Sequence, residues 1–240
     1  MKKQLFGALA ACVIGASLPA EALVGASRDG SAYAGHVVLL SKRSAHGGSL
    51  CSGVVVAQDV LLTAAHCAPN RNDVRAVVGD ALRAIADVAV HPGYRADAAK
   101  ARVKSIDLAL VRLAQPLPSS FSPVTISDRT SANVGETFTY VGFGMTNEAA
   151  PEQVGRLRAA TIPTQAPLSK VLLWASDSAN KGTGACAGDS GGGVFDGNDH
   201  LIAIIDWATG SGGKRCGNLT QSALVASERA WIDRVLAGWR

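Results

Sequence analysis

Short runs of β-branched and apolar residues recur along most of the chain, each ended by Gly, Pro, Asn or Asp, and this texture constrains the fold more than any other feature. Many short runs at close spacing are typical of an antiparallel barrel or sandwich. Apolar residues with helical spacing are clear only near the end, over residues 227–236. We therefore predict an all-β protein with a C-terminal α-helix, with strands near residues 36–40, 53–56, 74–78, 87–90, 108–113, 137–141, 193–195 and 201–205.

The first 22 residues have the features of an export signal. Two lysines precede an uncharged apolar run over residues 5–18, and Ala20 and Ala22 stand where a signal peptidase reads small residues. This run is too short to span a membrane, which takes about 20 apolar residues, and no later run is suitable. We expect cleavage after Ala22 and a secreted protein, extracellular or periplasmic, without a membrane span.

A second interpretation of the leader stays open. The segment Leu9-Ala10-Ala11-Cys12 resembles a bacterial lipobox, whose cysteine is acylated after cleavage. In that case residues 12–22 remain on the exported protein, and a further cut is needed to expose Leu23.

The composition, with 48% apolar and 18% charged residues, suits a soluble globular protein. The formal net charge is +4, but beyond the leader Lys and Arg form nothing longer than pairs such as Lys214-Arg215, so we expect no nucleic-acid partner. No spacing of His, Cys and Glu indicates a metal, and we expect no metal and no cofactor. The four cysteines after the leader favour disulfide bonds; three pairings are open, and two local loops are the most economical, Cys51–Cys67 and Cys186–Cys216.

Three separated segments each hold one residue of a potential catalytic triad. His66 follows an apolar strand and a turn of small residues, Asp107 begins an apolar strand, and Ser190 lies among glycines. Each of them alone is more typical of a structural residue. Together they supply a hydroxyl nucleophile, an imidazole base and a carboxylate that orients the imidazole. The neighbouring glycines permit backbone N–H groups to point at an oxyanion.

The segments 63–67 (TAAHC), 107–110 (DLAL) and 188–192 (GDSGG) resemble the three signatures of trypsin-like serine proteases of the chymotrypsin family. With the leader, the resemblance indicates a bacterial secreted member of the family. It covers nearly all of residues 23–240, because further similar segments occur in the same order at Leu23-Val24-Gly25-Ala26, Cys51-Ser52-Gly53-Val54-Val55, Val90-His91-Pro92-Gly93-Tyr94, Gly142-Phe143-Gly144, Trp207, Cys216 and Trp231.

The resemblance implies two packed six-stranded antiparallel β-barrels, at about 23–120 and about 130–226, followed by a helix at about 227–238. His66 and Asp107 would belong to the first barrel and Ser190 to the second. The implied protein is a monomeric secreted serine endopeptidase that hydrolyses polypeptide substrates through an acyl-enzyme. A protein protease inhibitor is a further partner that the family allows.

The resemblance also assigns roles around Ser190. The N–H groups of Gly188 and Ser190 would form the oxyanion hole, and the ammonium of Leu23 would pair with Asp189. Because the predicted signal cleavage itself leaves Leu23 first, we expect no zymogen stage. The substrate pocket would involve Gly184, Trp207 and Ala208.

Two departures from the family pattern bear on specificity and chemistry. Gly184 stands where cleavage after Lys or Arg requires a carboxylate, so we expect small or medium apolar side chains in the pocket. An acidic side chain drawn by Lys214 and Arg215 is the alternative. Asp206 replaces the family's usual Ser before Trp207, and a second carboxylate near Asp107 would raise one of the two pKa values.

Two other functions compete with an active protease. A non-catalytic relative on the same scaffold would normally have lost His66, Asp107 or Ser190, and all three are present. An esterase could use the same triad, but the nucleophile elbow and strand–helix alternation of the α/β-hydrolases are missing.

Overall fold

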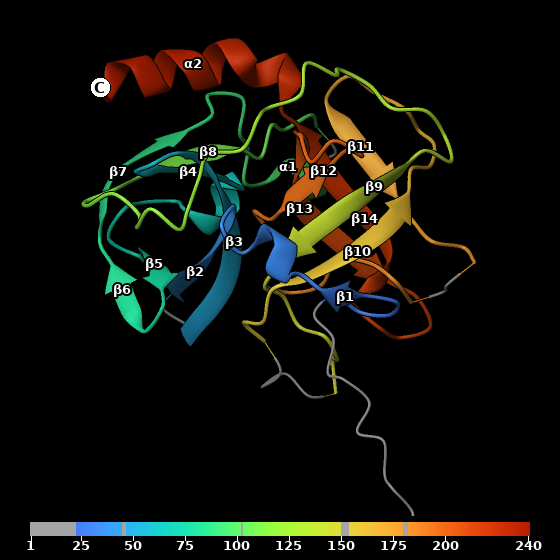
Figure 1. Cartoon of the computed structure of the whole chain (residues 1–240). Helices are drawn as coiled ribbons and strands as arrows, with labels where there is room; N and C mark the ends of the chain where they lie inside the picture. Colours follow the sequence, from blue (N-terminus) through green and yellow to red (C-terminus); the bar gives the residue numbers. More distant parts are fainter. Residues whose placement is uncertain (1–22, 45–46, 102, 150–153, 180–181) are drawn as a thin grey trace, which may run out of the picture.

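The computed structural model describes residues 23–44, 47–101, 103–149, 154–179 and 182–240, which form two antiparallel β-sheets packed against each other (Figure 1). The predicted leader at residues 1–22, including Cys12, lies outside the described residues. Over the described ranges, no helix has the length and apolar character to cross a membrane.

The first sheet has the strand order β6-β5-β2-β3-β4-β8-β7. Its strands β4 and β8 are buried along nearly their whole length, which explains why their sequences are apolar without alternation. The bounds are β2 (Val37–Ser44), β3 (Gly47–Ala57), β4 (Val60–Thr63), β5 (Val74–Val78), β6 (Ala81–Arg83), β7 (Ile85–Val90) and β8 (Ala109–Leu113).

The second sheet has the order β1-β10-β9-β12-β13-β14-β11. Its bounds are β1 (Arg28–Asp29), β9 (Thr137–Gly142), β10 (Arg158–Pro163), β11 (Leu172–Ala175), β12 (Gly193–Phe195), β13 (Leu201–Gly210) and β14 (Gly217–Leu224). The helical elements are η1 (Ser31–Tyr33), η2 (Ala65–Cys67), α1 (Ala98–Ala101), η3 (Ala226–Glu228) and α2 (Arg229–Gly238).

The prediction of two packed antiparallel barrels and a C-terminal helix is confirmed. Each sheet has seven strands where six were expected, because a short edge strand joins each of them. These are β1 with two residues and β6 with three residues.

Apolar burial holds the two sheets together. One cluster of buried side chains includes Leu61 and Leu110 of the first sheet together with Phe195 and Ile204 of the second. A separate cluster fills the second barrel and includes Leu23, which is completely buried. Each such side chain contributes about 1.5–3 kcal/mol when it leaves water, so the position of Leu23 fixes the start of the described chain inside the second barrel.

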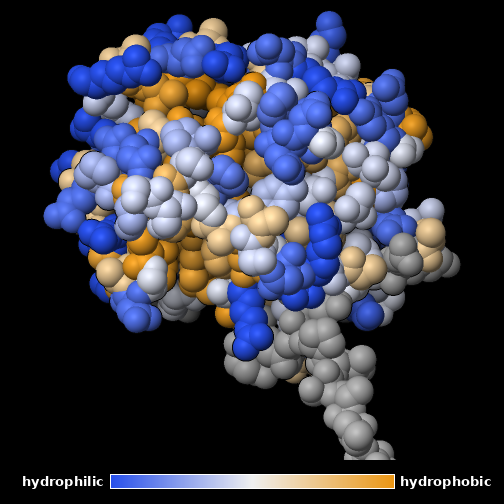
Figure 2. Space-filling model, viewed as in Figure 1, coloured by the Kyte–Doolittle hydropathy of each residue, from blue (hydrophilic) through white to orange (hydrophobic). Residues whose placement is uncertain are grey.

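Helix α2 lies along the outside of the first barrel (Figure 1). Its Trp231 and Ile232 are buried in the first cluster, while Arg229 and Asp233 form an ion pair at 3.0 Å on its exposed side. Figure 2 shows the hydrophilic outer side of this helix above a band of hydrophobic residues. The amphipathic pattern predicted for residues 227–236 therefore serves to cover the first barrel.

A buried histidine joins α2 to the segment that leads toward Asp107. Nε2 of His91 lies 3.0 Å from Glu228 Oε2, and its Nδ1 accepts a hydrogen bond from the N–H of Gly93 at 3.0 Å. The ring also contacts Trp231 edge-on, with centroids 4.7 Å apart. These contacts suit a neutral imidazole that donates from Nε2, and burial lowers the pKa of His91 although Glu228 opposes the change.

We expect His91 to make folding stability sensitive to acid. The unfolded chain takes up a proton at His91 near pH 6.5, whereas the folded side chain resists protonation. The contribution of His91 to the free energy of unfolding should be fully present above about pH 6.5. Below that pH the free energy of unfolding should fall, by at most about 1.4 kcal/mol per pH unit for one proton. Urea unfolding of the wild type and of His91→Gln at about pH 7.5, 6 and 5 separates the effect of protonating His91 from the effects of the other titratable groups. The stability difference between the two proteins should shrink toward acid pH, and a constant difference contradicts the expectation.

Candidate active site

The site begins at one end of the first barrel, where β4 and β8 run antiparallel. Thr63 at the end of β4 pairs with Ala109 at the start of β8, so the segments that follow β4 and precede β8 are neighbours. His66 lies on η2 directly after β4, and Asp107 stands just before β8. The strand pairing therefore brings an imidazole and a carboxylate together across 41 positions of sequence.

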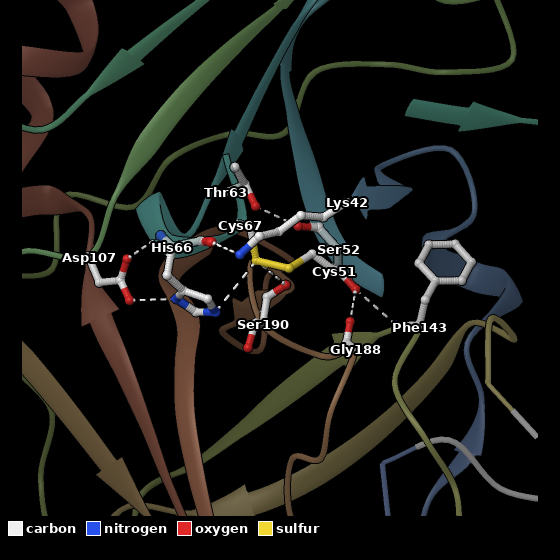
Figure 3. The surroundings of a disulfide bond; sticks show 10 residues. All are labelled: Lys42, Cys51, Ser52, Thr63, His66, Cys67, Asp107, Phe143, Gly188 and Ser190. Atoms are coloured by element: carbon white, nitrogen blue, oxygen red, sulfur yellow. Dashed lines mark hydrogen bonds and ion pairs between the residues drawn. A yellow bond between two sulfur atoms is a disulfide. The ribbon is translucent and has the colours of Figure 1, made fainter. Parts of the chain in front are cut away.

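Both oxygens of Asp107 hold His66. Nδ1 of His66 lies 2.7 Å from Asp107 Oδ2, and the backbone N–H of His66 donates to Oδ1 at 3.0 Å (Figure 3). A carboxylate against Nδ1 keeps the ring proton on that nitrogen. Nε2 is then the nitrogen that can accept a proton from a nucleophile.

Ser190 comes from the second barrel, on the turn between Cys186 and strand β12. It lines the same cleft as His66 and Asp107, and Figure 3 draws it beside the imidazole ring. Within the described chain no hydrogen bond joins the Ser190 hydroxyl to His66. Catalytic hydrogen bonds are often long when no substrate is bound. The structure contains the His66–Asp107 pair, and the hydrogen bond from Ser190 to His66 stays a prediction.

Two backbone donors of the Ser190 turn are without an acceptor in the part of the chain that the structure describes, namely the N–H groups of Gly188 and Ser190. The neighbouring N–H of Asp189 is bonded to the carbonyl of Cys186 at 3.1 Å. Gly188 has φ +101, and a Cβ there would come within 2.8 Å of Gly144 Cα, so glycine is required. Such a pair of donors is what an oxyanion needs, and their role stays a prediction.

Asp189 points into the second barrel and is completely buried. Its Oδ1 accepts from the N–H of Gly144 at 2.8 Å and its Oδ2 accepts from the N–H of Cys186 at 2.9 Å. Burial raises the pKa of Asp189 to about 7, although both hydrogen bonds lower it. A positive charge beside this carboxyl would keep it ionised. The structure shows Leu23 buried in the same barrel, and the pairing of its amino group with Asp189 stays a prediction.

Ser52 of strand β3 connects the first barrel to the Ser190 turn of the second barrel. Its N–H donates to the carbonyl of Ser190 at 2.7 Å, and its hydroxyl donates to the carbonyl of Gly188 at 3.0 Å. The same hydroxyl accepts from the N–H of Phe143 at 3.0 Å, and Thr63 donates to the Ser52 carbonyl at 2.7 Å (Figure 3). We call this set of bonds the Ser52 clamp.

Both predicted disulfide bonds are present. Cys51–Cys67 joins β3 to η2 beside His66, and Cys186–Cys216 joins the Ser190 turn to the segment before β14. Two groups of potential metal ligands occur in the described ranges, around His66 and around Glu148, and each contains both cysteines of one disulfide. Sulfur in a disulfide is no thiolate, so neither group offers the ligands that zinc prefers.

A cleft of about 830 Å³ runs across His66, Asp107 and Ser190. Of the predicted pocket residues, Trp207 and Ala208 line it, and Trp207 is 48% exposed. Gly184 is buried and does not line this cleft; a Cβ there would lie 3.3 Å from the Thr220 hydroxyl. The preference for apolar side chains therefore stays a prediction. Several other residues line the cleft without having been predicted as pocket residues, among them Tyr94, Arg95, Val103, Met145, Trp174 and Gln221.

Arg215, considered above as an attractant for acidic side chains, lies at the rim of the cleft. Its guanidinium is 3.6 Å from Glu148, and Glu148 also accepts the backbone N–H groups of Arg215 and Cys216 at 2.9–3.0 Å. These backbone bonds hold the pKa of Glu148 below its ordinary value. The charge of Arg215 thus has a partner within the protein.

The geometry of this site has counterparts among known proteins. The family model described as Trypsin matches residues 25–232. The chain belongs to the trypsin family. This trypsin-family protein is a serine endopeptidase, in agreement with its resemblance to named trypsins.

Curated relatives include trypsin epsilon of Drosophila erecta, 28% identical over 212 residues, which cover 78% of each chain. The trypsin of Saccharopolyspora erythraea is 26% identical over 206 residues, covering 78% of this chain and 86% of the relative. The relatives thus include insect proteins, and the bacterial type inferred from the leader stays a prediction.

Among solved structures, the scabies mite inactivated protease paralogue SMIPP-S-I1 has a TM-score of 0.71 at 18% identity, covering 90% of this chain and 99% of that one. Mouse neuropsin, a serine protease, has a TM-score of 0.70 at 20% identity, covering 88% and 99%. At these identities the two structures establish the fold of this trypsin-family protein and nothing further.

Proposed function

We propose that this trypsin-family protein is a secreted endopeptidase. In it, Ser190 attacks the peptide carbonyl, and His66 and Asp107 activate the Ser190 hydroxyl. The observation that carries the proposal is the double attachment of His66 to Asp107, with Nδ1 2.7 Å and the backbone nitrogen 3.0 Å from the carboxylate. Nε2, which lies 3.6 Å from the Cys67 sulfur, is not engaged by the carboxylate, and His66 lines the same cleft as Ser190.

Each step of the reaction uses a group described above. The Ser190 hydroxyl adds to the carbonyl carbon while His66 Nε2 takes its proton, and the N–H groups of Gly188 and Ser190 bind the resulting oxyanion. His66 then gives the proton to the leaving amine. Water, deprotonated by His66, cleaves the acyl-enzyme and restores the Ser190 hydroxyl.

Secretion is the second part of the proposal. Two disulfide bonds support an oxidising compartment, since such bonds are rare in cytosolic proteins. The leader over residues 1–22 supports export by its sequence. Polypeptides in the periplasm or outside the cell are then the substrates.

The alternative of a non-catalytic relative is tested by covalent labelling. A fluorophosphonate reacts with a serine only when a base activates it, so we expect stoichiometric labelling of the wild-type protein at Ser190, located by peptide mass spectrometry. His66→Ala, checked for folding by near-ultraviolet circular dichroism, is the matched control and should be labelled at least about 100-fold more slowly. Folded wild-type protein that resists the reagent would support the non-catalytic alternative.

A further inference from the structure

A bulge in strand β13 gives Asp206 an unusual position. Ile205 pairs with Ser222 and Trp207 pairs with Gln221, so Asp206 has no residue of its own opposite it on β14. Bulges of this kind redirect a side chain and are common next to active sites. Here Asp206 is only 5% exposed, and it lines the cleft together with His66 and Asp107.

The backbone around the bulge is fixed to the Ser190 turn. The N–H of Ile205 donates to the carbonyl of Gly192 at 2.9 Å, and the N–H of Gly191 donates to the carbonyl of Ile205 at 2.6 Å. The residue just before Asp206 is therefore tied to the two residues that follow Ser190. Asp206 is held in register with the nucleophile, not on a mobile loop.

Among the described residues, one of the two oxygens of the Asp206 carboxyl has a hydrogen-bond partner and the other has none. Its Oδ2 accepts a hydrogen bond from Gln221 Nε2 at 3.0 Å, whereas its buried Oδ1 has no hydrogen-bond partner in the described chain. A buried carboxylate oxygen without a donor is costly, and a proton on the carboxyl relieves much of that cost.

Three titratable groups act on Asp206 from the elements packed around it. The charge of Asp107, before β8, disfavours its ionisation, and a positive charge on His66, in η2, favours it. Tyr140 of β9 faces it as a neutral phenol, since burial raises the pKa of that hydroxyl. Burial is the largest influence on Asp206 itself and raises its pKa to about 7.

Coupling between two ionisable groups is reciprocal. If a positive charge on His66 favours ionisation of Asp206, an ionised Asp206 favours protonated His66 by the same free energy. Protonated His66 cannot accept the proton of Ser190. The state of Asp206 therefore bears on the pH at which the endopeptidase becomes active.

We propose that Asp206 is a positioning residue whose buried carboxyl, held by Gln221 at the β13 bulge, sets how readily His66 takes up a proton. This inference rests on the proposed role of the His66–Asp107–Ser190 triad. With Asp206 neutral, His66 is an available base at lower pH. With Asp206 ionised, the imidazolium is stabilised and the acid limb of activity moves to higher pH.

The test measures the ionisation of His66 directly in Asp206→Asn, which retains the shape and can still accept from Gln221. We expect the His66 pKa, followed by NMR of its ring nitrogens, to fall by about one unit, the size usual for loss of one nearby charge. The acid limb of kcat/KM should move by the same amount, with kcat at the optimum within about tenfold of the wild type. Asp233→Asn, the same change on the exposed side of α2, is the matched control and should leave both values unchanged.

Two results would overturn the proposal. One is a His66 pKa that is unchanged in Asp206→Asn, and the other is an equal loss of kcat at every pH without movement of the His66 titration. If Asp206→Asn does not fold, Asp206→Ser removes the same carboxyl, and the wild-type NMR titration must itself show two coupled steps at His66. Because this titration needs no turnover, it stands apart from the fluorophosphonate experiment, whose failure would count against the triad and not against the coupling.

Discussion

Replacement of Ser190 by Ala is expected to lower kcat by roughly 10⁶-fold, the loss seen when a triad nucleophile is removed. The size follows from the geometry around it. His66 is held by both oxygens of Asp107, so it is oriented to take one particular proton, and an alanine methyl group at position 190 has no such proton to give. Residual hydrolysis of roughly 10³- to 10⁴-fold over water should persist through the donors at Gly188 and residue 190.

The measurement is steady-state cleavage of a peptide substrate by purified protein, with active sites counted by titration in the wild type. Ser227→Ala is the matched control, since that hydroxyl is also hydrogen-bonded, at 2.6 Å to the carbonyl of Lys170, but lies outside the cleft. It should change kcat by less than about twofold, in keeping with most surface substitutions. Substantial activity in the folded Ser190→Ala protein would contradict the assignment of the nucleophile.

An uncleavable extension before Leu23 should produce the second largest loss of activity, a decrease of about 10²- to 10³-fold in kcat/KM. Asp189 is completely buried, and among the described residues its carboxylate receives two backbone N–H groups. If the ammonium of Leu23 is its partner, an extension removes that charge, and breaking a buried pair costs on the order of 3–5 kcal/mol. The Ser190 turn, in which Asp189 directly precedes the proposed nucleophile, would then lose its active arrangement.

A protein carrying an uncleavable extension is compared with one whose extension a second protease can remove. Activity should return in the latter when Leu23 becomes the first residue. An α-amino group has an ordinary pKa near 7.7–8.0, and pairing with Asp189 raises it, so activity should be retained through neutral pH and lost only as the pH rises through the raised value. N-terminal sequencing of active protein that starts at another residue would count against the pair, and a start at Cys12 would favour the lipobox.

The strands that the sequence predicted correctly are the ones whose burial shows in residue type. Strands β5, β8 and β12 agree with the predicted runs within a residue or two, because their β-branched and apolar residues are the buried ones. Strands β10, β11 and β14 were not predicted. Strand β14, with the sequence GNLTQSAL, buries Thr220 and Ser222 in the second barrel, so its polar composition hides its position. Such strands owe their structure to their neighbours more than to local preference.

The candidate site divides in the same way. His66, Asp107 and Ser190 stand in short segments that resemble the signatures of the trypsin family, so the sequence alone predicts them as site residues. The structure brings all three to one cleft. The roles of Ser52 and Gln221 could not be predicted, because each acts on a residue far along the chain: Ser52 on Gly188, 136 positions away, and Gln221 on Asp206 across a bulge. Only the register between strands, which no local pattern contains, brings such residues together.

The Ser52 clamp has a consequence for how the protein would lose activity under stress. Since the bonds from Ser52 to the carbonyls of Ser190 and Gly188 run from one barrel to the other, a separation of the barrels breaks them as it loosens the apolar cluster that both sheets share, while the cluster inside the second barrel stays packed. Inactivation in mild urea should therefore come ahead of the loss of tertiary structure, and the catalytic centre would act as the earliest sensor of inter-barrel loosening.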